Sequence, residues 1–198
     1  MPRVSRAEAE RNRIEIERVS SRLMRERGLS VSVADVMGAA GLTHGGFYKH
    51  FESKDDLIAV SCANAFGEAA ADWNASVARS AGGDDERATL IADYLEASNR
   101  QDAGEGCPMA ALATDVARSA PDAPVRDAFR EGFEGLLDIL TRTEPGGDAG
   151  VSARVDALAD VSLMVGALVL ARATAGDALS DEILAAARRA LIGENLGD

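Results

Sequence analysis

Apolar residues recur every three or four positions along most of this chain, which is the period of amphipathic α-helices. The period predicts a succession of helices over residues 7–27, 32–40, 43–50, 53–80, 84–101, 108–119, 124–143, 151–175 and 180–192. Glycine-rich or proline-containing breaks separate several of them, at residues 81–83, 102–106 and 144–147. The chain is also rich in alanine, with few aromatic residues and five prolines, so we expect an all-α protein.

The segment between residues 32 and 57 has the strongest local signals. Ser32 can cap a helix, Gly41 follows that helix where a left-handed residue ends it at little cost, and Thr43 can cap the next helix. Only a sharp turn fits between Ala40 and Thr43, so the two helices must cross steeply. This arrangement predicts a helix-turn-helix, which can place its second helix in the major groove of DNA.

The second helix of this pair, residues 43–50, presents few apolar side chains. Phe47 points inward, and Phe51 follows one turn later. The other faces carry histidine, tyrosine, lysine and two adjacent glycines, which suit phosphates and base edges better than a protein core. The glycines let the backbone approach DNA closely in one interpretation, and mark a simple loop in the other.

Residues 46–57, GFYKHFESKDDL, and the preceding residues 33–43 resemble the signature of TetR-family transcriptional regulators. The resemblance covers about the first sixty residues. It implies an N-terminal three-helix helix-turn-helix domain over residues 1–53, followed by a helical effector-binding and dimerisation domain over residues 54–198. It also implies a homodimer that binds a palindromic double-stranded DNA operator and a small-molecule effector.

Carried over position by position, the resemblance predicts the DNA-contacting residues. Tyr48, His50 and Lys54 suit contacts to phosphates, which position a protein without reading sequence. Lys49 can donate to guanine. The full set of DNA-binding candidates is Thr43, His44, Gly45, Tyr48, Lys49, His50 and Lys54.

The formal net charge of −12 looks unfavourable for binding DNA, but the charge is unevenly distributed. Residues 1–60 contain ten Lys and Arg against nine Asp and Glu, whereas residues 61–198 contain eleven against twenty-four. The acidic part of the chain is therefore kept away from the phosphates. We expect only modest non-specific affinity for DNA.

The second domain is expected to hold an effector cavity lined by larger apolar residues from separate helices, although each such residue also suits an ordinary core. Cys107 is a further candidate, because a helix N-terminus lowers the pKa of a thiol, although a buried inert thiol fits the pattern as well. The candidates are Trp73, Tyr94, Cys107, Met109, Phe129, Phe133 and Met164.

The last two helices are unusually apolar and need a cover. In the first, Val155, Leu158, Val165 and Val169 fall on one broad surface; in the second, Ile183, Leu184, Ala187 and Leu191 form a stripe. The resemblance implies that this pair forms the four-helix dimer interface, whereas packing within one protomer would produce the same periodicity.

Other classes of function find little support in the sequence. The two histidines share one short segment, no cysteine or carboxylate is spaced with them for a metal, and no glycine loop is built to hold phosphate. We expect no enzymatic activity, no cofactor, no membrane association and a cytoplasmic location. The sequence therefore predicts a DNA-binding transcriptional regulator, a ligand-released repressor; the alternative is a helical small-molecule-binding or structural dimer without useful DNA affinity.

Overall fold

The computed structural model describes residues 6–80, 86–143 and 151–193, and every regular element within these ranges is a helix. The predicted all-α fold is confirmed. The elements are α1 (Arg6–Arg27), α2 (Val33–Ala39), the 3-10 helix η1 (His44–Lys49), α3 (Lys54–Ser80), α4 (Glu86–Tyr94), α5 (Ala97–Gln101), α6 (Pro108–Arg118), α7 (Pro124–Arg142), α8 (Val151–Ala173) and α9 (Ala178–Ile192). The predicted breaks at residues 81–83 and 144–147 lie outside the described residues.

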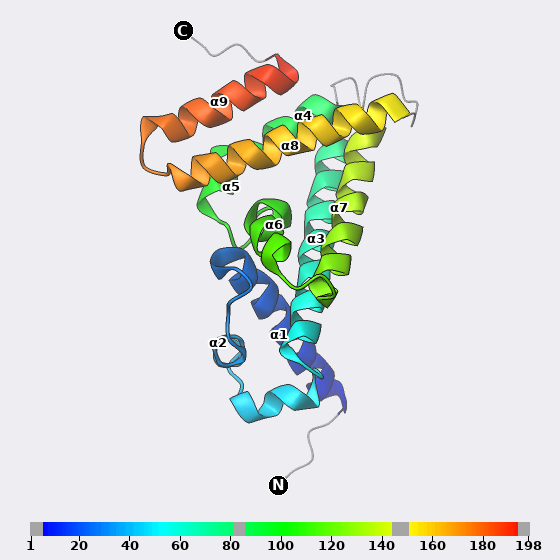
Figure 1. The fold of residues 1–198 in the computed structure, drawn as a ribbon, viewed down its shortest axis with the longest axis vertical. Coiled ribbons are helices and arrows are strands. Elements are labelled where there is room, and N and C mark those ends of the chain that lie inside the picture. Colours follow the sequence, from blue (N-terminus) through cyan, green and yellow to red (C-terminus); the bar gives the residue numbers. More distant parts are fainter. Residues whose placement is uncertain (1–5, 81–85, 144–150, 194–198) are drawn as a thin grey trace.

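The long helices α3 and α7 form the backbone of the molecule. Figure 1 shows α1, α2 and η1 at one end and α8 and α9 across the other, with α3 and α7 side by side between them. Gly132 of α7 lies directly against Phe66 of α3, and Phe66 meets Phe129 edge to face with ring centroids 5.1 Å apart. The absence of a side chain at Gly132 lets the two helices approach closely.

Buried apolar side chains form two clusters. The smaller contains Ile16, Val19, Leu23, Val31, Val36, Met37, Phe47, Phe51 and Leu57. The larger is built from α3, α4 and α6 to α9, with Met24 from the end of α1. Helix α3 contributes to both, because Leu57 belongs to the first cluster and Ile58 to the second. The division predicted between residues 53 and 54 stays a prediction, since one continuous helix serves both cores.

The single helix predicted over residues 84–101 is wrong. Helix α4 ends at Tyr94, Glu96 is extended with ψ 143°, and α5 begins at Ala97. The Asn99 side-chain amide donates to the carbonyl oxygens of Asp93 (2.7 Å) and Tyr94 (3.1 Å), which satisfies the last turn of α4. Periodicity did not indicate this break, because Leu95 remains buried through it.

Helix α9 begins two residues earlier than predicted, because the Asp177 side chain caps it by accepting from the Leu179 amide at 2.9 Å. None of the described helices has the length and apolar character that crossing a membrane requires.

Candidate functional site

The turn between α2 and η1 is fixed by local hydrogen bonds. The Ser32 hydroxyl accepts from the Asp35 amide at 3.1 Å, and the Asp35 carboxylate accepts from the Ser32 amide at 3.2 Å, so α2 begins with a capping box. At the other end Gly41 is left-handed, with φ 70°, and the Leu42 amide donates to the Met37 carbonyl at 2.8 Å. The predicted cap and the predicted left-handed glycine are both confirmed.

The segment after the turn differs from the predicted helix over residues 43–50. It is a 3-10 helix, His44–Lys49, and the Thr43 side chain forms no capping hydrogen bond. Two glycines in six residues make a longer α-helix unfavourable, by about 1 kcal/mol each relative to alanine. The predicted capping role of Thr43 is therefore wrong, although its exposed side chain stays a candidate for contacting DNA.

One face of η1 is anchored and the other is open to solvent. Phe47 is 0% exposed and stacks on Phe51 with ring centroids 5.6 Å apart, whereas Tyr48 is 73% exposed. The side chains of His44 and Lys49 are also exposed, and a Cβ added at Gly45 would meet nothing within 4 Å. The structure thus brings a tyrosine, a histidine, a lysine and open backbone onto one surface.

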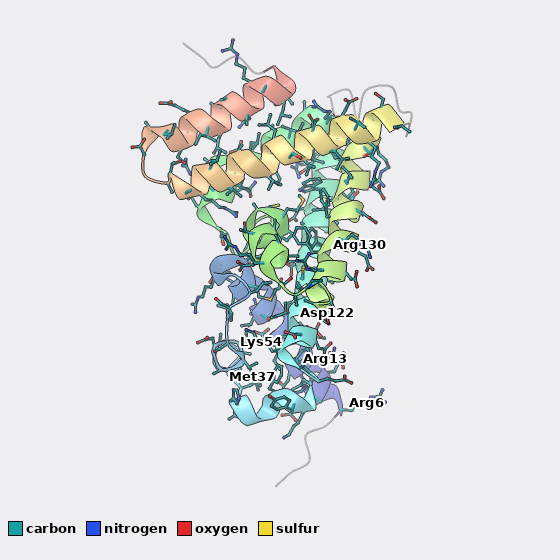
Figure 2. The ribbon with its side chains drawn as sticks, in the orientation of Figure 1. Arg6, Arg13, Met37, Lys54, Asp122 and Arg130 are labelled. Atoms are coloured by element: carbon teal, nitrogen blue, oxygen red, sulfur yellow. The ribbon has the colours of Figure 1, made fainter. Side chains whose placement is uncertain are left out.

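Arg13 of α1 holds η1 in place, a role that sequence reasoning missed. Its guanidinium donates to the His50 carbonyl at 2.9 Å, lies 4.8 Å from the centre of the Phe51 ring, and pairs with Glu17 at 2.9 Å (Figure 2). His50 itself is half-buried.

Lys54 also makes an unpredicted contact. Its ammonium group donates to the Leu29 carbonyl at 3.1 Å, which ties the start of α3 to the loop after α1. A lysine ammonium has three donors, so a contact between Lys54 and a phosphate stays a prediction alongside this structural role.

The end of α1 is attached to the larger core through polar contacts with the segment that precedes α6. Arg25, 5% exposed, donates to the Gly106 carbonyl at 3.3 Å and pairs with Glu68 of α3 at 2.6 Å. Arg22 pairs with Glu105 at 2.9 Å. The helix that supports the exposed face of η1 is therefore bonded directly to residues 105–106.

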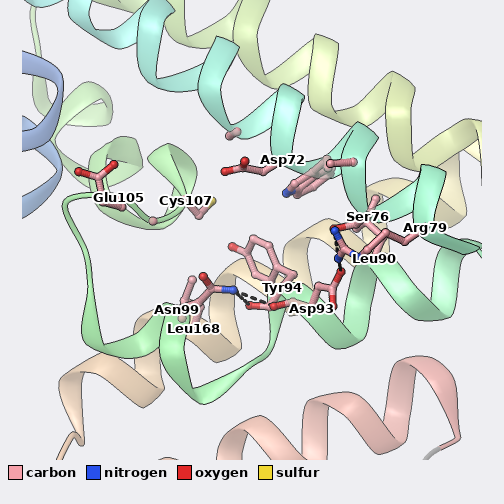
Figure 3. Close-up of a pocket in the computed structure, with 14 residues that line it drawn as sticks. Asp72, Ser76, Arg79, Leu90, Asp93, Tyr94, Asn99, Glu105, Cys107 and Leu168 are labelled. Atoms are coloured by element: carbon pink, nitrogen blue, oxygen red, sulfur yellow. Dashed lines mark hydrogen bonds and ion pairs between the residues drawn. The ribbon is translucent and has the colours of Figure 1, made fainter. Parts of the chain in front are cut away.

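The same residues, 105–106, line a cavity of about 300 Å³ (Figure 3). Three of the predicted ligand-binding residues come together there: Trp73, Tyr94 and Cys107. The Trp73 and Tyr94 rings meet edge to face, with centroids 5.9 Å apart. Sequence reasoning missed the polar lining, because polar residues on separate helices carry no periodic signal. This lining consists of Asp72, Ser76, Arg79, Asp93, Asn99 and Glu105.

The other predicted ligand-binding residues lie elsewhere. Met109, Phe129 and Phe133 line a second, more apolar hollow of about 200 Å³ beside α8. Met164 lines neither cavity and is fully buried in the larger core. The seven candidates therefore do not form one site.

Burial keeps the thiols of this protein protonated. It raises the pKa of Cys107, and the Tyr94 hydroxyl together with the amides of Ala110 and Met109 at the start of α6 offsets this only in part. The expectation that the helix N-terminus lowers the pKa of Cys107 is thus wrong, because desolvation is the larger effect. Burial alone raises the pKa of Cys62 to about 12.

The surface of α8 is apolar and uncovered. Val155, Leu158 and Val169 are exposed, as are Val151 and Leu170, so most of the surface predicted on this helix is present; Val165 is the exception, because it packs partly against the larger core. The stripe predicted on α9 instead faces inward: Leu184 and Ala187 are buried, and Ile183 and Leu191 pack against the larger core.

Within the described part of the chain, no group of three or more His, Cys, Asp or Glu side chains is placed to hold a metal ion.

The chain is similar to known proteins both in its N-terminal sequence and in its overall fold. Residues 17–60 match the family described as bacterial regulatory proteins of the tetR family. No curated protein sequence matches the chain.

Several solved structures share the fold of the chain. The reduced form of NemR from E. coli has a TM-score of 0.73 at 17% identity, over 92% of this chain and 96% of that one. A TetR-family regulator from Agrobacterium tumefaciens has a TM-score of 0.71 at 22% identity, over 92% and 98%. FadR from Bacillus subtilis, in complex with stearoyl-CoA, has a TM-score of 0.64 at 17% identity, over 92% and 99%.

Proposed function

We propose that this chain, a TetR-family transcriptional regulator by its N-terminal domain and its fold, is a homodimeric repressor that leaves its operator when a small molecule binds. The observation that carries the proposal is the exposed surface of η1, on which Tyr48, His44 and Lys49 stand free while Phe47 fixes the segment from below.

In this proposal the exposed surface of η1 enters the major groove. Tyr48 and the neighbouring Thr43 and His50 contact phosphates, His44 and Lys49 face the base edges, and Gly45 lets the backbone approach the groove. Lys54 adds a phosphate contact from the first turn of α3. The near-neutral charge of residues 1–60 makes these few cations decisive.

Release by a ligand follows from the contacts of the 105–106 segment. A molecule in the 300 Å³ cavity touches a segment that is bonded to Arg22 and Arg25 of α1, so displacing the segment moves the helix that positions η1. The ligand favours the arrangement whose two reading segments no longer match the operator spacing. A coupling of about 1–3 kcal/mol is enough for useful control.

The uncovered apolar surface of α8 supports dimerisation through the C-terminal helices. Its exposed valine and leucine side chains lie at the end of the molecule opposite η1 (Figure 1). Two protomers joined there would carry two reading segments related by a two-fold axis, which calls for a palindromic operator.

The test is binding of the purified protein to DNA from upstream of its own gene, at two salt concentrations, with competition by genomic fragments. We expect tight, sequence-selective binding that weakens steeply as salt rises. Absent or salt-independent binding, to this DNA and to the genomic fragments alike, contradicts the proposal and favours a helical small-molecule-binding dimer without useful DNA affinity.

Two variants test the roles within η1. Tyr48→Phe removes one hydroxyl from an exposed ring and should weaken binding to all sequences by a similar factor, about three- to tenfold. Gly45→Ala adds a methyl group that meets nothing within the protein, so thermal stability should not fall while operator affinity does. A change in sequence preference alone for Tyr48→Phe, or full affinity for Gly45→Ala, contradicts the assigned role.

A further inference from the structure

The side chains that line the cavity beside Trp73 include more acidic groups than basic ones. Three carboxylates, Asp72, Asp93 and Glu105, line it together with one cation, Arg79. Arg79 is already paired with Asp93, and Glu105 is paired with Arg22 at 2.9 Å. Among the described residues Asp72 forms no ion pair or hydrogen bond, so no neighbouring cation neutralises its negative charge.

A second polar group in the cavity also lacks a strong partner. Tyr94 is 5% exposed, and its buried hydroxyl has no nitrogen or oxygen partner within the described part of the chain; the group it meets is the Cys107 thiol, a weak hydrogen-bonding partner. A buried hydroxyl without a strong hydrogen-bonding partner is unfavourable, and a ligand that bonds to it would remove this cost. In Figure 3 the Asp72 carboxylate and the Tyr94 hydroxyl both project towards the space beside Cys107.

The apolar part of the lining favours an aromatic body. The Trp73 ring forms one wall, and Leu90, Leu168, Ala69 and Ala75 supply further apolar contacts. An indole face attracts cations as well as apolar groups. A cavity of about 300 Å³ lies at the lower end of the range for small organic ligands, so the guest is small.

We propose that the effector of this protein is a small aromatic compound carrying a protonated amine, with the ammonium group held by Asp72 and Tyr94 and the ring against Trp73. The inference rests on the proposed function, since it assigns a ligand class to the cavity of that regulator. An anionic ligand would meet three carboxylates; of the two nearby arginines, Arg79 is paired with Asp93, and the half-buried Arg172, which is not part of the lining, donates to the Asn99 carbonyl at 2.8 Å. Binding is non-covalent, because burial keeps the neighbouring Cys107 thiol protonated and therefore a poor nucleophile.

Trp73, the single tryptophan of the chain, reports binding directly through its fluorescence. The full-length protein at neutral pH is titrated with three compounds of similar size: 2-phenylethylamine as the cation, 2-phenylethanol as the neutral compound and 3-phenylpropanoate as the anion. We expect the amine to bind about tenfold more tightly than the alcohol, the size expected of a charge-assisted hydrogen bond, and the carboxylate to bind more weakly still. Isothermal calorimetry of the same titrations provides a readout that is independent of the fluorophore.

Variants connect this preference to the named residues. Asp72→Asn keeps the shape of an exposed side chain and should remove the preference for the amine over the alcohol. The matched control, Asp122→Asn, removes an exposed carboxylate from the loop before α7, away from the cavity, and should leave the preference unchanged (Figure 2). Tyr94→Phe should weaken binding of the amine by about threefold or more.

Three outcomes overturn the inference: tighter or equal binding of the carboxylate, no binding of the amine into the millimolar range, or an unchanged preference in Asp72→Asn. Operator binding is measured separately on the same protein without any compound. A protein that binds its operator selectively but shows one of these outcomes keeps the proposed function and loses the ligand class. A protein that binds the amine but no DNA loses the proposed function and keeps the chemistry of the cavity.

Discussion

Leu29 shows how single residues connect the two cores of this protein. Its amide donates to the Asp115 carboxylate of α6 at 2.9 Å, and its carbonyl accepts from the Lys54 ammonium of α3 at 3.1 Å. Gly28, with φ 79°, ends α1 immediately before it. One residue after α1 is thus held by both neighbouring helices, so α1 cannot move relative to α6 without breaking or bending these bonds.

Cys62 predicts a specific dependence of stability on pH. The folded thiol ionises only near pH 12, whereas an exposed thiol ionises near its ordinary value of 9.0, so the unfolded chain loses this proton first. The free energy of unfolding should therefore fall as pH rises from about 9 towards 12, and be unaffected by this group at lower pH. Urea unfolding of the parent and of Cys62→Ala, at pH values on both sides of this onset, measures the effect.

The comparison with Cys62→Ala isolates the thiol, because the burial of Tyr94 and Cys107 also raises their pKa values and destabilises the folded protein at high pH in both proteins. Parallel pH profiles for parent and variant would show that the Cys62 thiol ionises normally in the folded state.

At the scale of the elements, the close contact between α3 and α7 predicts opposite effects for two glycines of one helix. A methyl group at Gly132 would overlap the Cβ and ring atoms of Phe66, which cannot move without disturbing the core. Gly132→Ala should therefore lower the free energy of unfolding by about 1–3 kcal/mol. Chemical denaturation followed by far-ultraviolet circular dichroism measures this change.

Gly135 is the matched control, since it lies in the same helix with nothing within 4 Å of an added Cβ. Alanine is the better helix former, so Gly135→Ala should raise stability by up to about 1 kcal/mol. Equal effects of the two substitutions would mean that the helices do not approach each other as closely as described.

An element could be predicted from the sequence when the contacts that stabilise it come from residues nearby in the chain. Helix α7 was predictable because its apolar residues repeat with the helical period, and α2 because Ser32 and Gly41 act within a few residues of themselves. The break between α4 and α5 was not predictable, since it depends on a hydrogen bond from the Asn99 side chain back to the end of α4.

Some parts of the candidate site could be predicted from the sequence and others could not, for the same reason. The exposed face of η1 could be predicted from the polar residues and glycines around Phe47. The contact of Arg13 with η1 could not, because predicting it requires knowing that α1 and His50 lie together. The cavity lining combines residues from α3, α4, α5, α8 and the segment before α6, and only its two aromatic residues and Cys107 could be singled out from the sequence.

At the scale of the whole molecule, the exposed surface of α8 gives a test of the proposed dimer. Val155 is 57% exposed on α8, and Ile14 is 57% exposed on α1 at the other end of the molecule. Val155→Lys should weaken self-association by at least about tenfold, because a charge buried without a partner costs several kcal/mol. Ile14→Lys should leave self-association unchanged.

Sedimentation velocity over a concentration series measures both variants. Neither substitution should change the stability of the single protomer, as both side chains face solvent there. A parent protein that sediments as a monomer at every concentration, or a Val155→Lys dimer as tight as the parent, would show that α8 is not the interface.

The continuity of α3 through both cores has a consequence for how such chains diversify. Each residue of an α-helix advances the axis by about 1.5 Å and turns it by about 100°. Inserting or deleting one residue in α3 beyond Leu57 and Ile58 would therefore rotate the N-terminal domain away from the contacts that residues 105–106 make with Arg22 and Arg25 and that α6 makes with Leu29. Recombination can exchange the N-terminal domains of such proteins only at junctions that keep the two ends of α3 in the same rotational relation. The residues of α3 should therefore vary in identity while the number of residues in the helix stays fixed.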